Sequence, residues 1–545
     1  MKSGFKPSVL SMYTRDGVRL DADVYMPEGD GPFPVLLMRQ PYGRRIASTV
    51  VYAHPIWYVH HGYLVVIQDV RGRGSSEGAF EPFIHEKEDG YDTLDWVATL
   101  PGSNGCVGMY GFSYHGMTQL FAAASGNSAL KVIAPAMAAS DLYRHWAYEG
   151  DAFRLYGNMT WAAQLGAETA RRSGSHALYA RLHQMGHGPT GGELIDPAGL
   201  TVRQTLADTF YSEWMDNDAG SSYWCERSAG NQLAGVNIPA LHIGGWFDSF
   251  LSGTLANYDI LRQSGAPQRL VIGPWTHLPW TPAVGSVWLG ESAQSPVDRM
   301  QLRWFDRFLK DQVNGIDRAS LVELYDLRAG RWIFNEDFPD PTPIRFYLWS
   351  NGLANLDLGT GCLVDSPRSS ADDIFVLDPW RPVPTTGGHL GPSLGIHDRT
   401  AIDARPDVTT YTTEPFINAV QLAGAIKASL AVDSDAISFD LSAVLSVVDV
   451  DGRSRNLTQG YSRITGSGGP HRVDLRATCA LVRAGERLRL SVSGSCYPAF
   501  ALNDGSGRNP GTIGAADYKV ITLCLRPERS WLELPLTAAQ GDDVE

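Results

Sequence analysis

Cysteine is scarce in this sequence, and long apolar segments are absent. The 545 residues include six scattered cysteines and no Cys-x-x-Cys pair, so neither a disulfide framework nor a cysteine-ligated zinc site is expected. No stretch approaches the ~20 consecutive apolar residues of a membrane span, and residues 1–20 lack the apolar core of a signal peptide. We therefore expect a soluble, cytoplasmic protein without a membrane partner.

Positive charge is also in short supply. The chain has 45 Lys and Arg against 59 Asp and Glu, a formal net charge of -14, and no basic block. Nucleic-acid binding depends on clustered cations that neutralise phosphates, so no nucleic-acid partner is expected. Aromatic residues are plentiful, with 15 Trp and 22 Tyr, which suits pockets lined by rings. A small molecule is the expected partner, and a homo-oligomer remains an alternative to a monomer.

The most informative stretch is segment 108–116, Gly-Met-Tyr-Gly-Phe-Ser-Tyr-His-Gly. It places Ser113 between Gly111 and Gly116, after a short apolar run and before a longer one. Strand, sharp turn and helix in this order form a nucleophile elbow, in which the flanking residues must be nearly without side chains. The spacing is Gly-x-Ser-x-x-Gly, so the second glycine comes one place later than in the common form. Alone, the pattern also fits an ordinary strand-to-helix turn.

Buried strands and helices alternate on both sides of this turn. Short continuous apolar runs, typical of strands buried on both faces, lie at 34–38, 63–67, 106–110, 132–135, 238–245 and 268–273. Helical spacing of apolar residues recurs at 88–100, 253–264 and 297–312. The alternation predicts a parallel α/β sheet, built by residues 1–139 and 237–337 as one discontinuous catalytic domain.

Two further regions interrupt and follow this sheet. Residues 140–236 show little strand pattern but have aromatic-rich helical stretches at 143–164, 167–185 and 206–214. They form either a plain helical subdomain or a cap over the active site, and their insertion at the carboxyl edge of the sheet favours the cap. Residues 338–545 alternate apolar and polar positions between turn residues, which predicts a β-sandwich. Its expected role is packing, with carbohydrate binding as the alternative.

An acid and a base for Ser113 follow at the ends of two predicted strands. Asp248 and His277 each lie just past the C-terminal end of such a strand, where the active sites of open α/β sheets gather. Ser, Asp, His is also the chain order of α/β-hydrolases. The imidazole takes the proton of the serine hydroxyl, and the carboxylate fixes the imidazole tautomer. His277 is favoured as the base because His242 lies mid-strand.

No metal or cofactor is expected. His183 and His187 have the i,i+4 spacing of zinc ligands on a helix, but no third ligand accompanies them. The loop at 69–78 is rich in glycine but lacks the Lys-Ser/Thr of a phosphate-binding loop. We interpret it as an irregular loop held by its own charged residues.

Acyl transfer also needs two hydrogen-bond donors for the oxyanion that forms at the attacked carbonyl. The backbone N–H of Tyr114, directly after Ser113, supplies one. The second should come from the loop after the strand at 34–38, where Tyr42 carries a phenol that can donate. On the residues alone, a packed aromatic ring is the alternative reading of Tyr42.

Several motifs run through nearly the whole chain in the order of one family. Besides the elbow, they occupy 39–42, 69–78, 138–143, 244–248, 273–277, 378–388, 404–415 and 451–458. With them the chain resembles the cocaine esterase and X-Pro dipeptidyl-peptidase family of serine hydrolases, which includes α-amino acid ester hydrolases and glutaryl-cephalosporin acylases.

The resemblance implies an α/β-hydrolase domain with an inserted helical cap and a C-terminal jelly roll. It implies a catalytic triad of Ser113, Asp248 and His277. The Tyr42 phenol and the Tyr114 N–H would then form the oxyanion hole. An aromatic acyl pocket is implied near Trp146, Trp161 and Phe250, and His115, two places after Ser113, is a further candidate residue of this pocket.

Three functions follow, of which the first is a carboxylic-ester hydrolase working through an acyl-enzyme. The second keeps the triad but is an X-Pro dipeptidyl-peptidase or a β-lactam or α-amino acid ester acylase. That function needs a carboxylate for the substrate amine, for which Glu149 or Asp151 could serve, although two exposed carboxylates on a helix are the simpler explanation. His115, where the amino acid ester hydrolases carry an acid, gives no support for amine binding. The third is a catalytically silent binding protein, against which the complete triad argues.

Overall fold

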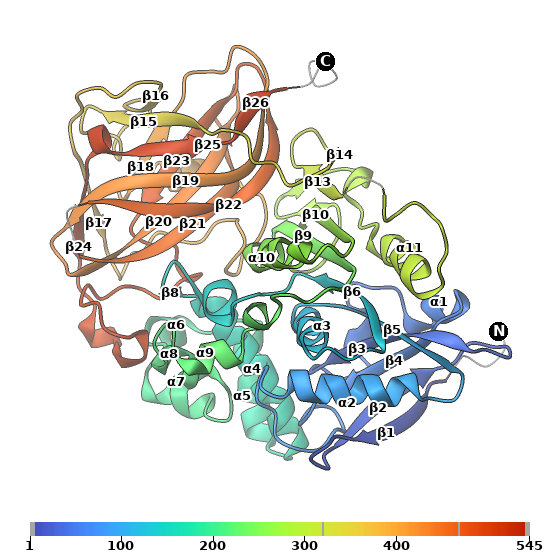
Figure 1. Ribbon diagram of the computed structural model, residues 1–545. Coiled ribbons are helices and arrows are strands. Elements are labelled where there is room, and N and C mark those ends of the chain that lie inside the picture. Colours follow the sequence, from blue (N-terminus) through green and yellow to red (C-terminus); the bar gives the residue numbers. More distant parts are fainter. Residues whose placement is uncertain (1–5, 319–320, 467–468, 540–545) are drawn as a thin grey trace.

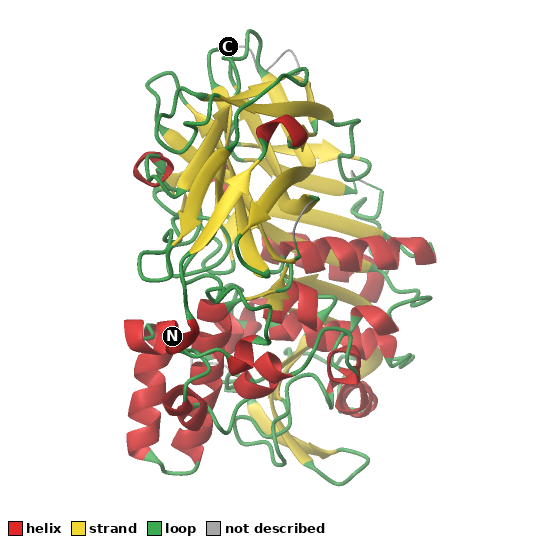
Figure 2. Cartoon of the chain, turned by 90° about the vertical axis from the view of Figure 1, so that its left-hand side faces the viewer, coloured by secondary structure: helices red, strands yellow, loops and turns green. Residues whose placement is uncertain are grey.

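The computed structural model describes residues 6–318, 321–466 and 469–539. A large sheet flanked by helices is built by the first part of the chain, and a β-sandwich by the last part (Figure 1). Figure 2 shows the same division from the side, with most helices in the lower half and the long strands of the sandwich above. This is the α/β-hydrolase domain with a helical cap and a C-terminal jelly roll that the sequence predicts.

The large sheet has ten strands. Their spatial order is β1 (Ser8–Tyr13), β2 (Arg19–Tyr25), β4 (Leu64–Asp69), β3 (Phe33–Gln40), β5 (Ser103–Phe112), β6 (Leu130–Ala136), β9 (Ala240–Phe247), β10 (Gln268–Thr276), β13 (Val322–Asp326) and β14 (Arg331–Asn335). From β4 to β13 neighbouring strands are parallel, and the outer pairs are antiparallel. The predicted parallel sheet is confirmed. Strand β1 was not predicted, because five of its six residues are exposed and carry no burial pattern.

Helices cover both faces of this sheet, as the alternation of side chains in β3 shows. Val35 and Leu37 pack in one core with α2 (Glu86–Ala98) and α3 (Tyr114–Ala124). Leu36 and Met38 point to the other face. There they pack in a second core with α1 (Pro55–His60) and α11 (Val297–Leu309).

The cap lies between β6 and β9. Its helices are α4 (Leu155–Arg172), α5 (His176–His187), α6 (Gly191–Ile195), α7 (Leu200–Thr205), α8 (Tyr211–Asp216) and α9 (Ser222–Glu226). The helix expected over 143–164 is wrong in its first half. A π-helical turn, Tyr143–Ala147, leads instead into a hairpin of β7 (Tyr148–Glu149) and β8 (Ala152–Phe153).

The hairpin turn at Gly150 and Asp151 explains this difference. Both residues have positive φ, 50° and 63°, which a right-handed helix does not allow. A Cβ on Gly150 would lie 2.1 Å from the Tyr461 carbonyl oxygen of the sandwich. The turn is therefore set by a tertiary contact with a distant part of the chain.

Two short strands, β11 (Ala283–Val284) and β12 (Val287–Trp288), pair only with each other. The sandwich holds the other strands. They are β15 (Ile344–Ser350), β16 (Gly361–Val364), β17 (Asp373–Leu377), β18 (Val408–Thr412), β19 (Val420–Ser434), β20 (Ser438–Val448), β21 (Ser454–Thr465), β22 (Pro470–Val482), β23 (Arg487–Ser493), β24 (Ile521–Leu525), β25 (Trp531–Leu534) and β26 (Leu536–Ala538). Their apolar interior is continuous with Trp246 and Phe247 of β9 and with Leu251, which opens α10 (Leu251–Leu261). The sandwich thus packs directly against the elements on either side of the predicted acid.

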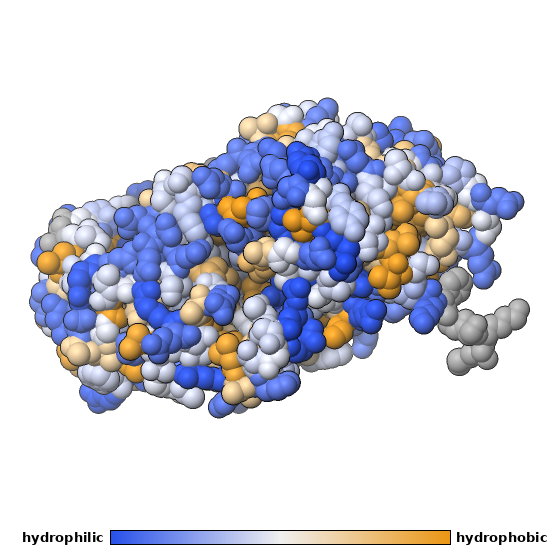
Figure 3. All heavy atoms as spheres, turned by 90° about the horizontal axis from the view of Figure 1, so that it is seen from below, coloured by the Kyte–Doolittle hydropathy of each residue, from blue (hydrophilic) through white to orange (hydrophobic). Residues whose placement is uncertain are grey.

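On the face seen in Figure 3, hydrophobic side chains form small separate groups among hydrophilic ones. Of the helices described, none combines the length and the apolar character that a bilayer crossing requires.

Candidate active site

Ser113 occupies a strained turn between β5 and α3. Its backbone has φ 61° and ψ -125°, a conformation that residues with a side chain rarely adopt. A Cβ on Gly111, whose φ is 135°, would come within 2.4 Å of the His115 Cβ. One on Gly116 would lie 2.8 Å from the Ala136 carbonyl oxygen. Both glycines of the predicted motif are therefore required by close backbone approach, including the one in the shifted position.

The predicted acid and base lie side by side. Asp248 directly follows β9 and His277 directly follows β10, and these strands are parallel neighbours in the sheet. The Nδ1 atom of His277 lies 2.7 Å from Oδ1 of Asp248. Asp248 is fully buried, and its other carboxylate oxygen accepts the backbone N–H of Phe250 at 3.0 Å. Such a pair orients the imidazole so that its Nε2 is the atom available to a nucleophile.

Tyr42 lies in the loop after β3, at the same cavity as Ser113. The indole Nε1–H of Trp161 donates to the Tyr42 hydroxyl oxygen at 3.0 Å. Burial raises the pKa of Tyr42 to about 12, partly offset by hydrogen bonds to Trp161 and Ser113. The phenol is therefore protonated at neutral pH. With its oxygen accepting from Trp161, its O–H is left as a donor.

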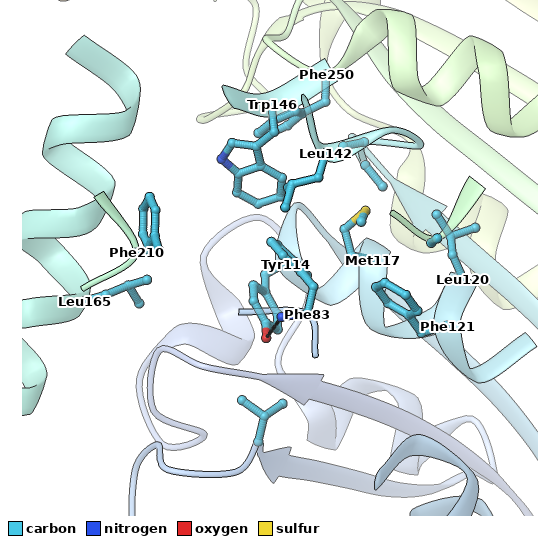
Figure 4. Packing of buried hydrophobic residues seen from close by; sticks show 14 of the residues in the cluster. Phe83, Tyr114, Met117, Leu120, Phe121, Leu142, Trp146, Leu165, Phe210 and Phe250 are labelled. Atoms are coloured by element: carbon cyan, nitrogen blue, oxygen red, sulfur yellow. Dashed lines mark hydrogen bonds between the residues drawn. The ribbon is translucent and has the colours of Figure 1, made fainter. Parts of the chain in front are cut away.

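Tyr114 directly follows Ser113, and its side chain points away from the predicted oxyanion hole. Its phenol donates to Oε1 of Glu86 at 2.6 Å and accepts the backbone N–H of Phe83 at 3.3 Å. Figure 4 shows the hydrogen bond between Phe83 and Tyr114 and the close packing of their rings. The backbone N–H of Tyr114 belongs to the first turn of α3, where no carbonyl of the helix can accept it.

An aromatic cavity of about 400 Å³ opens beside Ser113 and His277. The rings implied for the acyl pocket all line it, namely Trp146, Trp161 and Phe250. The Trp146 ring centroid lies 4.4 Å from that of Phe250 and 4.7 Å from that of Trp161. Figure 4 shows Trp146 and Phe250 lying against each other next to α3. The structure thus brings the residues predicted for the triad, the oxyanion hole and the acyl pocket to one place.

His115 also lines this cavity, and its ring is fully enclosed. It packs edge-on against Tyr42 and Phe112, with centroids 5.5 Å apart in each pair. Neither ring nitrogen has a hydrogen-bond partner among the described residues. Burial, aided by the charge of His277, lowers the pKa of His115 to about 3. The ring is therefore uncharged at neutral pH, and it lines the cavity as a neutral group with one donor and one acceptor nitrogen.

The expectation for Glu149 and Asp151 is wrong, because neither residue is on a helix. Asp151 is exposed in the turn of the β7–β8 hairpin, beside the Tyr143 phenol. Glu149 is on β7, and its carboxylate is paired with Arg154 and Arg476. The cavity lining includes neither residue, nor any other carboxylate among those described.

Sequence reasoning missed several residues of the site. Ala47, Val50 and Leu278 line the mouth of the cavity, and Val50 and Leu278 are about half exposed at 51% and 48%. Leu390 reaches the lining from the β-rich part of the chain, and Arg154 from the cap. No local pattern marks any of them, so only the assembled fold reveals them. His183 and His187 lie elsewhere, on α5, with ring centroids 4.3 Å apart.

Comparisons with known proteins agree with this architecture. Residues 16–279 match the X-Pro dipeptidyl-peptidase (S15 family) model, and residues 314–529 match that of the X-Pro dipeptidyl-peptidase C-terminal non-catalytic domain. The chain is 33% identical to cocaine esterase of Rhodococcus sp. over 527 residues, covering 90% of this chain and 91% of that protein.

Solved structures show the same fold over almost the whole length. An aminopeptidase from a marine sediment Thaumarchaeota archaeon superposes with a TM-score of 0.82 at 22% identity, covering 98% of this chain and 97% of the other. An α-amino acid ester hydrolase gives 0.77 at 21% identity, covering 97% and 96%. The identity to cocaine esterase and the two matched models confirm the family predicted from the motifs. The chain belongs to the X-Pro dipeptidyl-peptidase (S15) family of hydrolases, together with cocaine esterase.

Proposed function

We propose that this protein hydrolyses carboxylic esters, with Ser113 as the nucleophile, His277 as the general base and Asp248 as the acid that orients it. The observation that carries the proposal is the 2.7 Å contact between His277 and the buried Asp248, at a cavity that Ser113 also lines. This is the arrangement in which a serine hydroxyl becomes a nucleophile.

The reaction proceeds in two steps. Nε2 of His277 takes the hydroxyl proton as Ser113 attacks the acyl carbon, and returns it to the leaving alcohol. Water, activated by the same imidazole, then releases the acid from the acyl-enzyme. In both steps the Tyr42 O–H and the Tyr114 N–H stabilise the oxyanion, which is worth roughly 10²–10³ in rate for each donor in comparable sites.

The pocket favours an ester with an aromatic or bulky apolar acyl group. Three aromatic rings surround the space beside Ser113, and the uncharged His115 closes another side. The name of the relative cocaine esterase supports an ester bond as the point of cleavage. Peptidase or amino acid ester activity is less well supported, because the described cavity lining has no carboxylate for an α-ammonium group.

We also infer a reducing, cytoplasmic location. The support is the state of the six cysteines, all of which are unpaired, as is usual for proteins of reducing compartments. The partner proposed is a small-molecule ester.

A panel of chromogenic substrates tests the function. It contains p-nitrophenyl acetate, butyrate, octanoate and benzoate, an Ala-Pro p-nitroanilide and a glutaryl anilide, each with the wild type and with Ser113→Ala. We expect ester turnover, fastest for benzoate, that Ser113→Ala abolishes. Faster cleavage of the Ala-Pro anilide than of any ester would replace the esterase by a peptidase, and ester turnover retained in Ser113→Ala would refute the nucleophile.

A further inference from the structure

A buried ionic cluster joins the cap and the sandwich to the backbone at Asp248 and Ser249, here called the acid loop, and its Arg154 also lines the cavity beside Ser113. Glu149 of β7 accepts hydrogen bonds from Nη2 of Arg154 at 2.8 Å and from Nη2 of Arg476 at 3.3 Å. Its third partner is Nε2 of His389, at 2.9 Å. The exposed fractions of the four side chains are only 2% to 14%. Arg154 precedes α4 of the cap, whereas Arg476 lies on β22 of the sandwich.

Arg476 reaches from this cluster to the backbone that carries the proposed acid. Its Nη1 donates to the carbonyl oxygen of Asp248 at 2.6 Å, and its Nη2 to that of Ser249 at 2.6 Å. Arg154 adds a bond from its Nη1 to the Ser249 carbonyl at 3.0 Å. Two guanidinium groups therefore hold the two peptide groups at which the chain leaves β9, and Glu149 holds both guanidinium groups.

The protonation states of the cluster follow from burial and from its ion pairs. Burial opposes ionisation of Glu149, but His389, Arg476 and Arg154 around it hold the pKa of its carboxyl well below the usual value. Burial, aided by Arg476, lowers the pKa of His389 to about 4, so this ring is a neutral donor at pH 7. Among the four side chains, Glu149 then carries the single negative charge between two guanidinium groups, and the charge of the nearby Asp248 also acts on Arg154.

The stability of the fold alone does not explain such a cluster. Apolar residues of similar volume often replace buried ion pairs without loss of stability, because desolvation offsets the attraction between the charges. Catalysis, in contrast, tolerates little displacement of its groups, and a misplacement of about 1 Å can cost on the order of 10² in rate. Arg476 donates to the backbone carbonyl of Asp248, and the position of Asp248 determines its contact with His277.

We propose that Arg476 is a positioning residue for ester hydrolysis, through which the C-terminal sandwich keeps Asp248 in place against His277. The inference rests on the proposed function. It assigns to the segment that matches a non-catalytic domain a direct part in arranging the active site. Arg476 itself touches neither the substrate nor the reacting atoms.

The test compares Arg476→Met and Arg476→Lys with the wild type. Active sites are first counted by covalent titration with a fluorophosphonate, so that unfolded protein does not enter the rates. We then measure kcat, KM and the pH profile of kcat/KM on a p-nitrophenyl ester. For Arg476→Met we expect kcat to fall about 10- to 100-fold with KM nearly unchanged. Lysine keeps the charge but lacks the planar guanidinium that can donate to two carbonyls at once. The kcat of Arg476→Lys should therefore lie between those of the wild type and Arg476→Met.

The pH profile separates positioning from mere destabilisation. The Asp248 carboxylate stabilises the His277 imidazolium, whereas the neighbouring His115 is neutral above about pH 3. Loosening Asp248 should therefore move the acid limb of kcat/KM to lower pH. A merely structural role of Arg476 would leave that limb in place.

Arg489→Met is the matched control. Arg489 is a buried arginine of the same sandwich, paired with Asp403 and bonded to Thr412, and it does not contact the acid loop. Its variant should keep the wild-type kcat per titrated site and the wild-type acid limb. Wild-type values for Arg476→Met, or an equal change in Arg489→Met, would overturn the positioning role.

The rate of fluorophosphonate labelling separates this inference from the proposed function. If no ester is hydrolysed but the reagent labels Ser113 in the wild type, the ester assignment fails. Slower labelling of Arg476→Met than of Arg489→Met would then still support the positioning role, and equal labelling rates would refute it.

Discussion

The Tyr42 hydroxyl is set as a donor by one neighbouring side chain. Its oxygen accepts the Trp161 indole N–H, and burial keeps its proton in place. We predict that Tyr42→Phe lowers kcat for p-nitrophenyl esters by roughly 10²–10³ with little change in KM, because the lost bond forms only with the oxyanion. Steady-state kinetics measures this. Trp161→Phe keeps an aromatic ring, although a smaller one, but loses the indole N–H, and it should lower kcat by less. A wild-type kcat in Tyr42→Phe would exclude the phenol from the oxyanion hole.

His115 has two ring nitrogens without partners among the described residues, in a fully buried place. An unsatisfied buried polar group costs about 1–3 kcal/mol. We predict that His115→Leu, of similar volume, raises the free energy of unfolding by about 1 kcal/mol and leaves ester turnover within a few-fold. Urea denaturation and kinetics at pH 7.5 check both parts. A lower stability would show that the ring has a partner in solution.

At the scale of elements, the turn between β5 and α3 depends on close backbone approach. A Cβ at position 116 would lie 2.8 Å from both the Ala136 carbonyl oxygen and the Ala138 Cβ. We predict that Gly116→Ala lowers the free energy of unfolding by about 1–3 kcal/mol. It should also lower kcat, because α3 and the Tyr114 N–H must shift. Thermal unfolding and kinetics measure the two effects.

Gly192 in α6 is the matched control for that substitution. A Cβ there would meet no atom within 4 Å, so Gly192→Ala should leave kcat unchanged and stability equal or slightly higher. Equal losses in both variants would show that the cost arises from any added methyl group and not from the elbow.

For the whole molecule, buried histidines should set the acid limit of stability. Burial lowers the pKa of His145, His242 and His389 to about 4, and that of His115 to about 3. In the unfolded chain these rings titrate near 6.5. Below that pH the unfolded state binds protons that the folded state does not bind. The free energy of unfolding is therefore highest above about pH 6.5 and decreases as the pH falls towards 4.

We therefore predict that the free energy of unfolding decreases between pH 6.5 and 4, by up to about 1.4 kcal/mol per pH unit for each buried ring. Urea titrations at pH 7.5, 6 and 5 measure the slope. His115→Leu removes one of the rings and should give a shallower slope than the wild type. A slope that is flat, or that rises towards acid, would contradict the assignment of these rings as neutral and buried.

The sequence by itself determined the parallel sheet, the elbow, and the positions of Asp248 and His277 after their strands. These features can be predicted from local patterns. Apolar runs, the order of strand and helix, and the glycines of a tight turn each depend on residues that are close in the sequence. The sandwich could be predicted for the same reason. The aromatic pocket and the role of Tyr42 needed the family resemblance as well.

Only the tertiary structure showed which residues far apart in the sequence are in contact. Arg476 donates to the carbonyl of Asp248 from 228 positions further along the chain, and His389 meets Glu149 from 240 positions away. Because of these contacts, Glu149 is the centre of a buried cluster and not the exposed carboxylate that the sequence led us to expect. No local pattern encodes such pairs, because they follow from how the cap and the sandwich pack on the sheet, and that packing is a property of the whole chain.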